Sequence, residues 1–284
     1  MVLERLGVLT DEVSDNFIEA LDWIAGQGLK YVEVRVIDGK NVADLSDEQL
    51  AEVRQQAEKR NIKISAVASP VFKCKLDPER TVAAGDMFGQ QEETVAAHFE
   101  KLDRVMEIAK QLGTKRIRIF SFWREQDPAA HREEIVAHLR KAAAAAEREG
   151  ILLLLENEPS CNGGFAEEVA DLVRGVDSPA LQGLWDPGNE AYGAREAYPA
   201  GYAAMKGTIA HVHLKDAYIT ADGTARCVPL GSGQVPFIEQ LKALSADGYD
   251  GLFTIETHFA PAGGSKMSGT HMTLEALRIL VKEV

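Results

Sequence analysis

The chain has 284 residues, of which 45% are hydrophobic and 26% are charged, and its formal net charge is −13. This balance is typical of a globular protein with a full apolar core, and the negative charge argues against a nucleic-acid partner, because phosphate binding requires Lys and Arg. Three cysteines without a C-x-x-C pair argue against a disulfide framework and against a thiolate zinc site.

The chain carries no segment that we expect to enter a membrane. Its first 15 residues, MVLERLGVLTDEVSD, lack the uninterrupted apolar stretch of a signal peptide, and the longest aliphatic run, Ile151 to Leu155, is far too short to span a bilayer. Together with the sparse cysteines, this predicts a soluble protein of the cytoplasm.

Short β-rich runs alternate with helical stretches along the whole sequence. Several of the runs are nearly continuous in Val, Ile and Leu, which is typical of strands covered by helices. The helical period is clearest at residues 95–109, and Gly28, Gly113, Gly150 and Gly248 each stand where a helix should end before a strand. In chain order the expected strands are 6–10, 31–37, 64–70, 116–122, 151–157, 181–186, 209–216 and 251–257.

Eight strand–helix units predict one (β/α)8 TIM barrel, an α/β fold, as a single domain over residues 1–284. The alternative is an open doubly wound sheet, which usually has fewer strands and a glycine-rich phosphate loop after the first one. The segment after the first strand, LTDEVSDN, contains no glycine. The active site of a barrel lies at the C-terminal ends of its strands.

Four polar residues stand at the ends of four successive strands, namely Glu156, Asp186, His213 and Glu256. Their spacings are 30, 27 and 43 residues, about one strand–helix unit each. Taken singly, such a residue is usually a helix cap or a solvated loop residue. Three carboxylates converging in one barrel mouth would repel one another unless neutralised, so we predict that the four hold one divalent metal ion.

The oxygen-rich ligand set with one imidazole suits Mn²⁺, which we favour, and also Mg²⁺, Co²⁺, Zn²⁺ or Fe²⁺. Four protein ligands leave two positions for adjacent oxygens of a hydroxy-ketone or a diol. In HVH, His213 lies nearer the mouth than His211 and is therefore the better ligand. The same argument prefers Glu256 to His258.

Further residues are candidates for substrate binding. Lys215 shares the inward face of His213 and could hold a substrate oxygen, and His211 is a packed or supporting imidazole beside it. Glu33 shares a strand face with Arg35, where an ion pair could be structural or could contact substrate. Trp123 could form an apolar wall for a sugar.

The motifs LLLENEP, WDPGN, HVHLKD and TIETH resemble those of the xylose-isomerase-like barrel superfamily, which includes sugar isomerases, ketose 3-epimerases and inosose dehydratase. The resemblance covers essentially the whole barrel. It implies that Glu156 and Glu256 are catalytic as well as ligands. One would remove a proton next to a metal-polarised carbonyl to give an enediolate, and the other would return a proton. The implied activity is a metal-dependent isomerase or epimerase of a small sugar or polyol.

Two positions depart from the epimerase pattern. The epimerases have a histidine three residues after the aspartate ligand, where this chain has Asn189, which can bind a hydroxyl but cannot titrate. Their catalytic arginine follows the histidine ligand closely, whereas the nearest arginine here is Arg226, thirteen residues on. Arg226 could act from its loop or lie at the surface.

Three alternatives stay open. A dehydratase of the inosose dehydratase type begins with the same proton abstraction. An endonuclease IV-like DNA-repair enzyme would need three zinc ions and more histidines than the seven present. A metal-free binding protein would have lost a ligand, and none is lost. The sequence is also compatible with a homo-oligomer.

Overall fold

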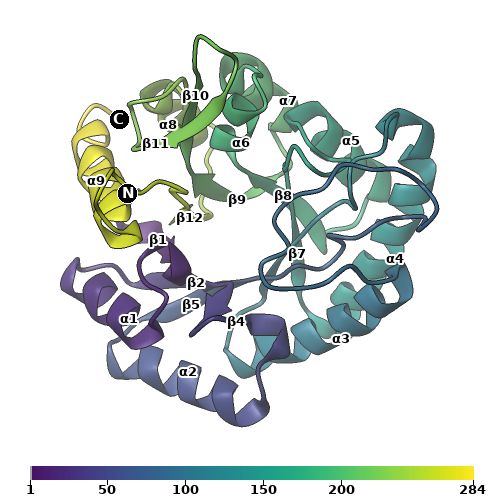
Figure 1. The fold of residues 1–284 in the computed structure, drawn as a ribbon, viewed down its shortest axis with the longest axis horizontal. Coiled ribbons are helices and arrows are strands. Elements are labelled where there is room, and N and C mark those ends of the chain that lie inside the picture. Colours follow the sequence, from purple (N-terminus) through teal and green to yellow (C-terminus); the bar gives the residue numbers. More distant parts are fainter. Residues whose placement is uncertain (1) are drawn as a thin grey trace.

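The computed structural model describes residues 2–284 and forms a closed barrel of eight parallel strands surrounded by helices (Figure 1). The strand order around the barrel is β1, β12, β9, β8, β7, β6, β5, β2, and β1 pairs with both β12 and β2 to close it. This confirms the predicted (β/α)8 fold. The barrel strands are β1 Leu6–Leu9, β2 Tyr31–Val34, β5 Lys63–Ala68, β6 Arg116–Ile119, β7 Leu152–Glu156, β8 Leu181–Trp185, β9 Ile209–Leu214 and β12 Leu252–Ile255.

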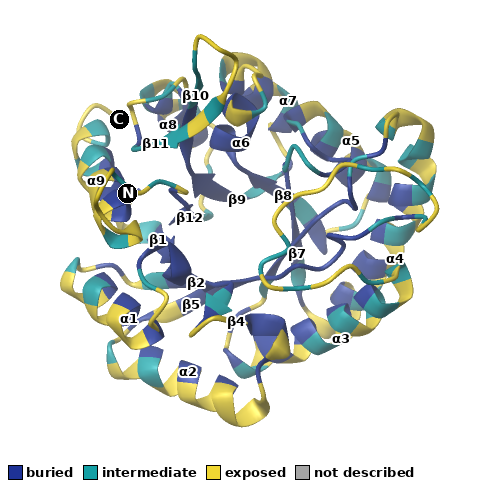
Figure 2. Cartoon of the chain, viewed as in Figure 1, coloured by how far each residue is buried: buried dark blue, intermediate teal, exposed yellow. Residues whose placement is uncertain are grey.

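Helices lie outside the barrel and bury one face against it, while their outer faces are exposed (Figure 2). The left-handed backbone expected at the four helix-ending glycines is present, with φ between 66° and 77°. The helices are α1 Phe17–Gly26, α2 Asp47–Lys59, α3 Val95–Gln111, α4 Arg132–Glu149, α5 Ala166–Val176, α6 Pro187–Tyr192, α7 Tyr202–Met205, α8 Phe237–Ala246 and α9 Lys266–Leu280. No helix in the described part of the chain is long and apolar enough to cross a membrane.

The sixth unit differs from the regular alternation. Instead of one helix after β8, the chain forms the short α6, a wide turn at Ala197–Gly201 and then α7. Asp186 begins α6 as its N-cap, with Pro187 in the first turn, where a missing N–H costs nothing. Gly188 follows because a Cβ there would lie 2.4 Å from the Lys215 carbonyl oxygen. The WDPGN sequence therefore lets α6 start against the end of β9.

Two small hairpins lie at the mouth of the barrel, and the sequence analysis predicted neither. The first joins β3 Val36–Ile37 to β4 Lys40–Asn41, and the second joins β10 Asp216–Ile219 to β11 Ala225–Val228. In the second hairpin the buried Asp216 carboxylate accepts bonds from the backbone N–H groups of Gly231, Gly233 and Val235. This aspartate therefore shapes the loop that precedes α8.

Candidate metal centre

The four predicted ligands come together at the C-terminal end of the barrel. Glu156 ends β7, Asp186 follows β8, His213 lies in β9 and Glu256 follows β12. One ligand atom from each lies within 4.8 Å of the others, and all four side chains are buried. Neighbouring parallel strands thus place residues from distant parts of the sequence in one small space.

Asp186 shows how the local structure prepares a ligand. Its Oδ1 accepts the N–H of Asn189 at 2.9 Å as the cap of α6. Asn157 fixes its backbone, accepting the Asp186 N–H at 2.8 Å and donating to its carbonyl at 2.9 Å. The other oxygen, Oδ2, lies 2.8 Å from Lys215 Nζ but makes no hydrogen bond. A buried carboxylate oxygen with free lone pairs fits a cation, so the residues present suit a divalent metal.

Each glutamate has one oxygen held by a buried arginine. Arg118 donates to Glu156 Oε2 at 2.7 Å, and Arg35 donates to Glu256 Oε1 at 2.7 Å. The second oxygens, Glu156 Oε1 and Glu256 Oε2, lie 3.2 and 3.3 Å from His213 Nδ1. One oxygen of each carboxylate therefore remains turned toward the histidine ligand.

Burial and these cations set the protonation of the acids. Burial raises the pKa of each carboxyl, but at Glu156 the Arg118 guanidinium and His213 together outweigh burial and lower the pKa to about 2. At Glu256, Lys215, His258 and His213 together outweigh burial and hold the pKa well below its usual range. Burial prevails at Asp186, whose pKa is raised to about 6 although Lys215 opposes the shift. The charges of the chain thus keep both glutamates ionised.

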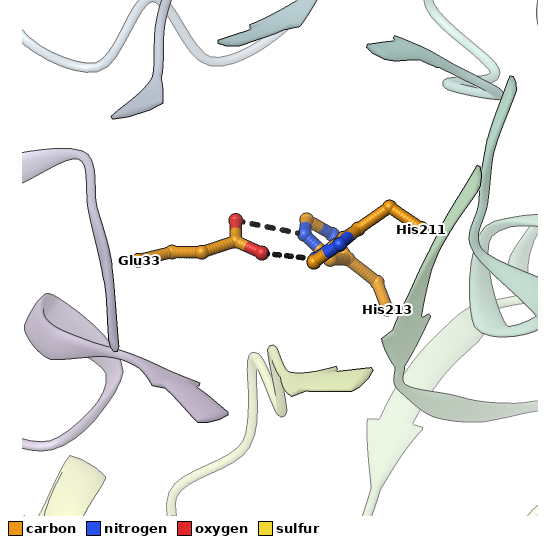
Figure 3. Close-up of side chains that lie close together, drawn as sticks. All are labelled: Glu33, His211 and His213. Carbon is orange, nitrogen blue, oxygen red and sulfur yellow. Dashed lines mark hydrogen bonds and ion pairs between the residues drawn. The ribbon is translucent and has the colours of Figure 1, made fainter. Parts of the chain in front are cut away.

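Glu33 sits behind His213 inside the barrel and binds both histidines of HVH (Figure 3). Its Oε2 lies 3.1 Å from His213 Nε2, and its other oxygen bonds His211 Nε2. Burial opposes the charge on His213, but Glu33 and Glu256 raise its pKa well above the ordinary value. A carboxylate on one ring nitrogen of a ligand histidine fixes which nitrogen faces the metal.

Of the two roles left open for Glu33 and His211, substrate contact and structural support, their position favours support. Both side chains have no exposed surface and lie behind the ligands, and neither lines the cavity at the barrel mouth. Arg35, which directly follows β2, pairs with Asp11, Glu12 and Glu256 instead. Glu33 and His211 therefore lie beside His213 and outside the cavity lining.

A cavity of about 810 Å³ lies beside the ligand cluster, and its lining includes three of the candidate substrate-binding residues, Asn189, Lys215 and Arg226. Asn189 Nδ2 donates to the Asn157 carbonyl at 2.8 Å, which leaves its amide oxygen as the free acceptor. Lys215 Nζ lies 3.0 Å from Glu256 Oε2, and Arg226 is an exposed residue of β11. Lys215 and Asn189 connect the cavity to the ligand cluster.

Trp123 does not line this cavity. It is 3% exposed, packs with Phe120 and Cys161, and donates its indole N–H to Glu92 at 2.8 Å. It lies behind the cavity wall.

Another cavity, of about 680 Å³, lies at the opposite end of the barrel, where Tyr31, Lys63 and Arg116 begin their strands, far from the ligands.

Three histidines outside the HVH motif bear on the alternative of an endonuclease IV-like enzyme, which would need more histidine ligands. His98 and His138 lie in α3 and α4, and His131 precedes α4. Within residues 2–284, the groups able to hold a metal are the four ligands and the set of Glu33, His211 and His213, which share one histidine. This is poorer than the array expected for a three-zinc nuclease.

The structure is thus a (β/α)8 barrel with a candidate divalent-metal centre at its active-site end. A family model described as xylose isomerase-like TIM barrel matches residues 21–280, and the chain belongs to this family. No curated protein matches the sequence significantly.

Solved structures share the fold at low identity. A xylose isomerase-like TIM barrel protein from Mycobacterium smegmatis in complex with magnesium is 18% identical, with a TM-score of 0.71, over 94% of this chain and 89% of that one. The IolI protein with a bound zinc atom is 19% identical, with a TM-score of 0.73, over 98% of each chain. D-psicose 3-epimerase from Clostridium cellulolyticum H10 with D-tagatose is 17% identical, with a TM-score of 0.69, over 98% of this chain and 95% of that one.

Proposed function

We propose that the protein is a divalent-metal-dependent isomerase or epimerase of a sugar or sugar-like polyol. The observation that carries the proposal is the cluster of Glu156, Asp186, His213 and Glu256, with ligand atoms within 4.8 Å of one another beside a cavity. The magnesium and zinc in two proteins of the same fold, and the sugar in a third, support the choice. We favour Mn²⁺ as the native ion.

A divalent ion at this cluster would polarise a substrate carbonyl and a neighbouring hydroxyl, which acidifies the C–H bond between them. Glu156 or Glu256 then takes that proton, and the electrons of the C–H bond move into an enediolate. Both carboxylates are ionised, so either can be the base. Because the other glutamate also starts ionised, it first takes a proton from solvent; it then delivers this proton to the opposite face, giving an epimer, or to the neighbouring carbon, giving an isomer, while the base releases the abstracted proton to solvent.

The neighbouring residues restrict how the glutamates move. Arg118 and Arg35 each hold one glutamate oxygen, so only the second oxygen can exchange a proton. Asn189 and Lys215 line the cavity, and their amide oxygen and ammonium group would serve as an acceptor and a donor for substrate hydroxyls.

The test is turnover in deuterated water with Mn²⁺-loaded protein across ketoses and inososes. We expect deuterium on the carbon next to the carbonyl, because a carboxylate-borne proton exchanges with solvent. Glu256→Gln should keep substantial metal and lose at least about a hundredfold in rate. Glu125→Gln, which changes a buried glutamate paired with Arg80 outside the site, is the control.

Other outcomes assign other reactions. A product without solvent deuterium, from protein with two metals per chain, would indicate a hydride shift. Loss of water with new ultraviolet absorbance would indicate a dehydratase. Protein that takes up no divalent metal when grown with Mn²⁺, Co²⁺ and Zn²⁺ would refute the proposal.

A further inference from the structure

Lys73 is a buried lysine without a counter-ion. It lies in the loop after β5, is 2% exposed, and its ammonium group stands over the rings of Phe88, Phe120 and Trp123, with Nζ 4.3, 4.5 and 5.6 Å from their centroids. Within residues 2–284 no carboxylate forms an ion pair or hydrogen bond with this ammonium.

The other buried cations of the barrel mouth are all matched. Arg35 is paired with Asp11, Glu12 and Glu256, Arg118 with Glu156, and Lys215 with Asp186 and Glu256. A buried charge is costly unless it is paired, and aromatic faces replace only part of the lost hydration. The neighbouring thiol of Cys161 is not an anion, because burial raises its pKa to about 12. Lys73 alone among these cations therefore lacks an anionic partner.

Lys73 also lines the cavity beside the ligand cluster, together with Arg226 and with Lys215, which pairs with Asp186 and Glu256. It shares two aromatic rings with Arg118, whose Cζ lies 5.3 Å from the centroid of Phe88 and 4.4 Å from that of Phe120. Arg118 in turn holds Glu156. The same two rings thus separate the unpaired ammonium of Lys73 from the Arg118 guanidinium that binds Glu156, a proposed catalytic residue.

We propose that Lys73 binds an anionic oxygen group of the substrate, so that the substrate is a sugar acid or a sugar phosphate rather than a neutral sugar. The proposal rests on the function proposed above for the same cavity. One end of the substrate lies at the ligand cluster, and a carboxylate or phosphoryl group at the other end pairs with Lys73. A charge-assisted hydrogen bond to that group supplies the missing counter-ion.

Calorimetric titration of the Mg²⁺-loaded protein tests this with two matched pairs of probes, D-gluconate against D-sorbitol and D-glucose 6-phosphate against D-glucose. We expect the anion of one pair to bind at least about tenfold more tightly than its neutral partner, and the pair that shows this preference identifies carboxylate or phosphoryl. Lys73→Met should abolish the preference, and Lys73→Arg should keep part of it. Lys75→Met, two residues along the same loop, should leave it unchanged.

Equal binding of anion and neutral partner in both pairs, or a preference that survives Lys73→Met, would overturn the proposal. If Lys73→Met does not fold, the wild-type pairs decide together with Lys73→Arg. The two proposals fail separately. Mg²⁺ binding without any anion preference removes the Lys73 assignment alone, whereas a Lys73-dependent preference in protein that binds no metal removes the metal proposal alone.

Discussion

Replacing Glu33 by glutamine should weaken metal binding although Glu33 is not a ligand. The carboxylate accepts from both histidines of HVH, one at each oxygen. When a metal replaces the ring proton on Nδ1 of His213, the remaining proton lies on Nε2 against Glu33, and the lone pair of Nδ1 faces the space between Glu156 and Glu256. Glutamine has nearly the same shape but only one acceptor oxygen. When its NH₂ group faces His213, the ring must turn its proton to Nδ1, where it blocks a metal.

The expected size follows from comparable supports of ligand histidines, whose loss costs roughly 10–100-fold in metal affinity, or about 1.4–2.7 kcal/mol. Glu33 has no exposed surface, so solvent cannot replace the lost acceptor and the upper half of this range applies. The alternative orientation, with NH₂ toward His211, does not rescue the site, because His211 Nδ1 is buried without a partner and its ring also prefers to donate from Nε2.

Competition titration of Mn²⁺ against a fluorescent chelator measures the effect, with circular dichroism to show that the variant is folded. Glu125→Gln is the matched control. Glu125 is also buried, but its partner is Arg80, 3.2 Å from it, and the pair lies outside the ligand cluster. Folded Glu33→Gln protein that binds Mn²⁺ within threefold of wild type would refute the reasoning about His213.

Two further variants probe buried charge. Lys215→Met leaves Asp186 and Glu256 without their shared ammonium, so the metal-free protein should lose about 3–5 kcal/mol in denaturant unfolding; Mn²⁺ should restore more stability than in wild type, and equal stability without metal would contradict this. Burial lowers the pKa of His98 from 6.5 to about 4. As the pH falls, His98 is therefore protonated in the unfolded chain before it is protonated in the folded one. The stability from neutral His98 is complete above pH 6.5 and should fall by about 3 kcal/mol toward pH 4. His98→Gln should flatten that part of the unfolding curve, and an unchanged slope would exclude His98 as its source.

The barrel was predictable because its signals are local and repeated. Each of the eight strands is a short apolar run, and each run ends where the structure ends the strand to within a few residues. The two hairpins and the broken sixth helix were not predicted. Their strands have two to four residues. Asp216 holds the loop between the second hairpin and α8 through backbone N–H groups 15 to 19 residues further along the chain, which no periodicity reveals.

That the four candidate ligands converge in space was predictable for a related reason. A residue at a strand end has a fixed place in a barrel, so sequence alone could gather Glu156, Asp186, His213 and Glu256. The partners of these residues were not predictable, because a strand face does not specify which side chain meets which across the barrel. Glu33 lies in β2 and Arg35 directly follows it, yet Glu33 bonds the histidines of β9 and Arg35 bonds Glu256 after β12.

The fold alone does not require the buried ion pairs at the barrel mouth. Buried ion pairs are often replaceable by apolar side chains at no loss of stability, so Arg118–Glu156 and Arg35–Glu256 are weak supports for the fold. Each arginine nevertheless holds one oxygen of its glutamate at 2.7 Å and leaves the other oxygen beside His213. A carboxylate that only neutralised a charge would gain from offering both oxygens. One that must face a cation and also exchange a proton needs one oxygen fixed and the other turned toward the cation; in both glutamates the second oxygen faces His213, and in Glu256 it also accepts from Lys215 at 3.0 Å.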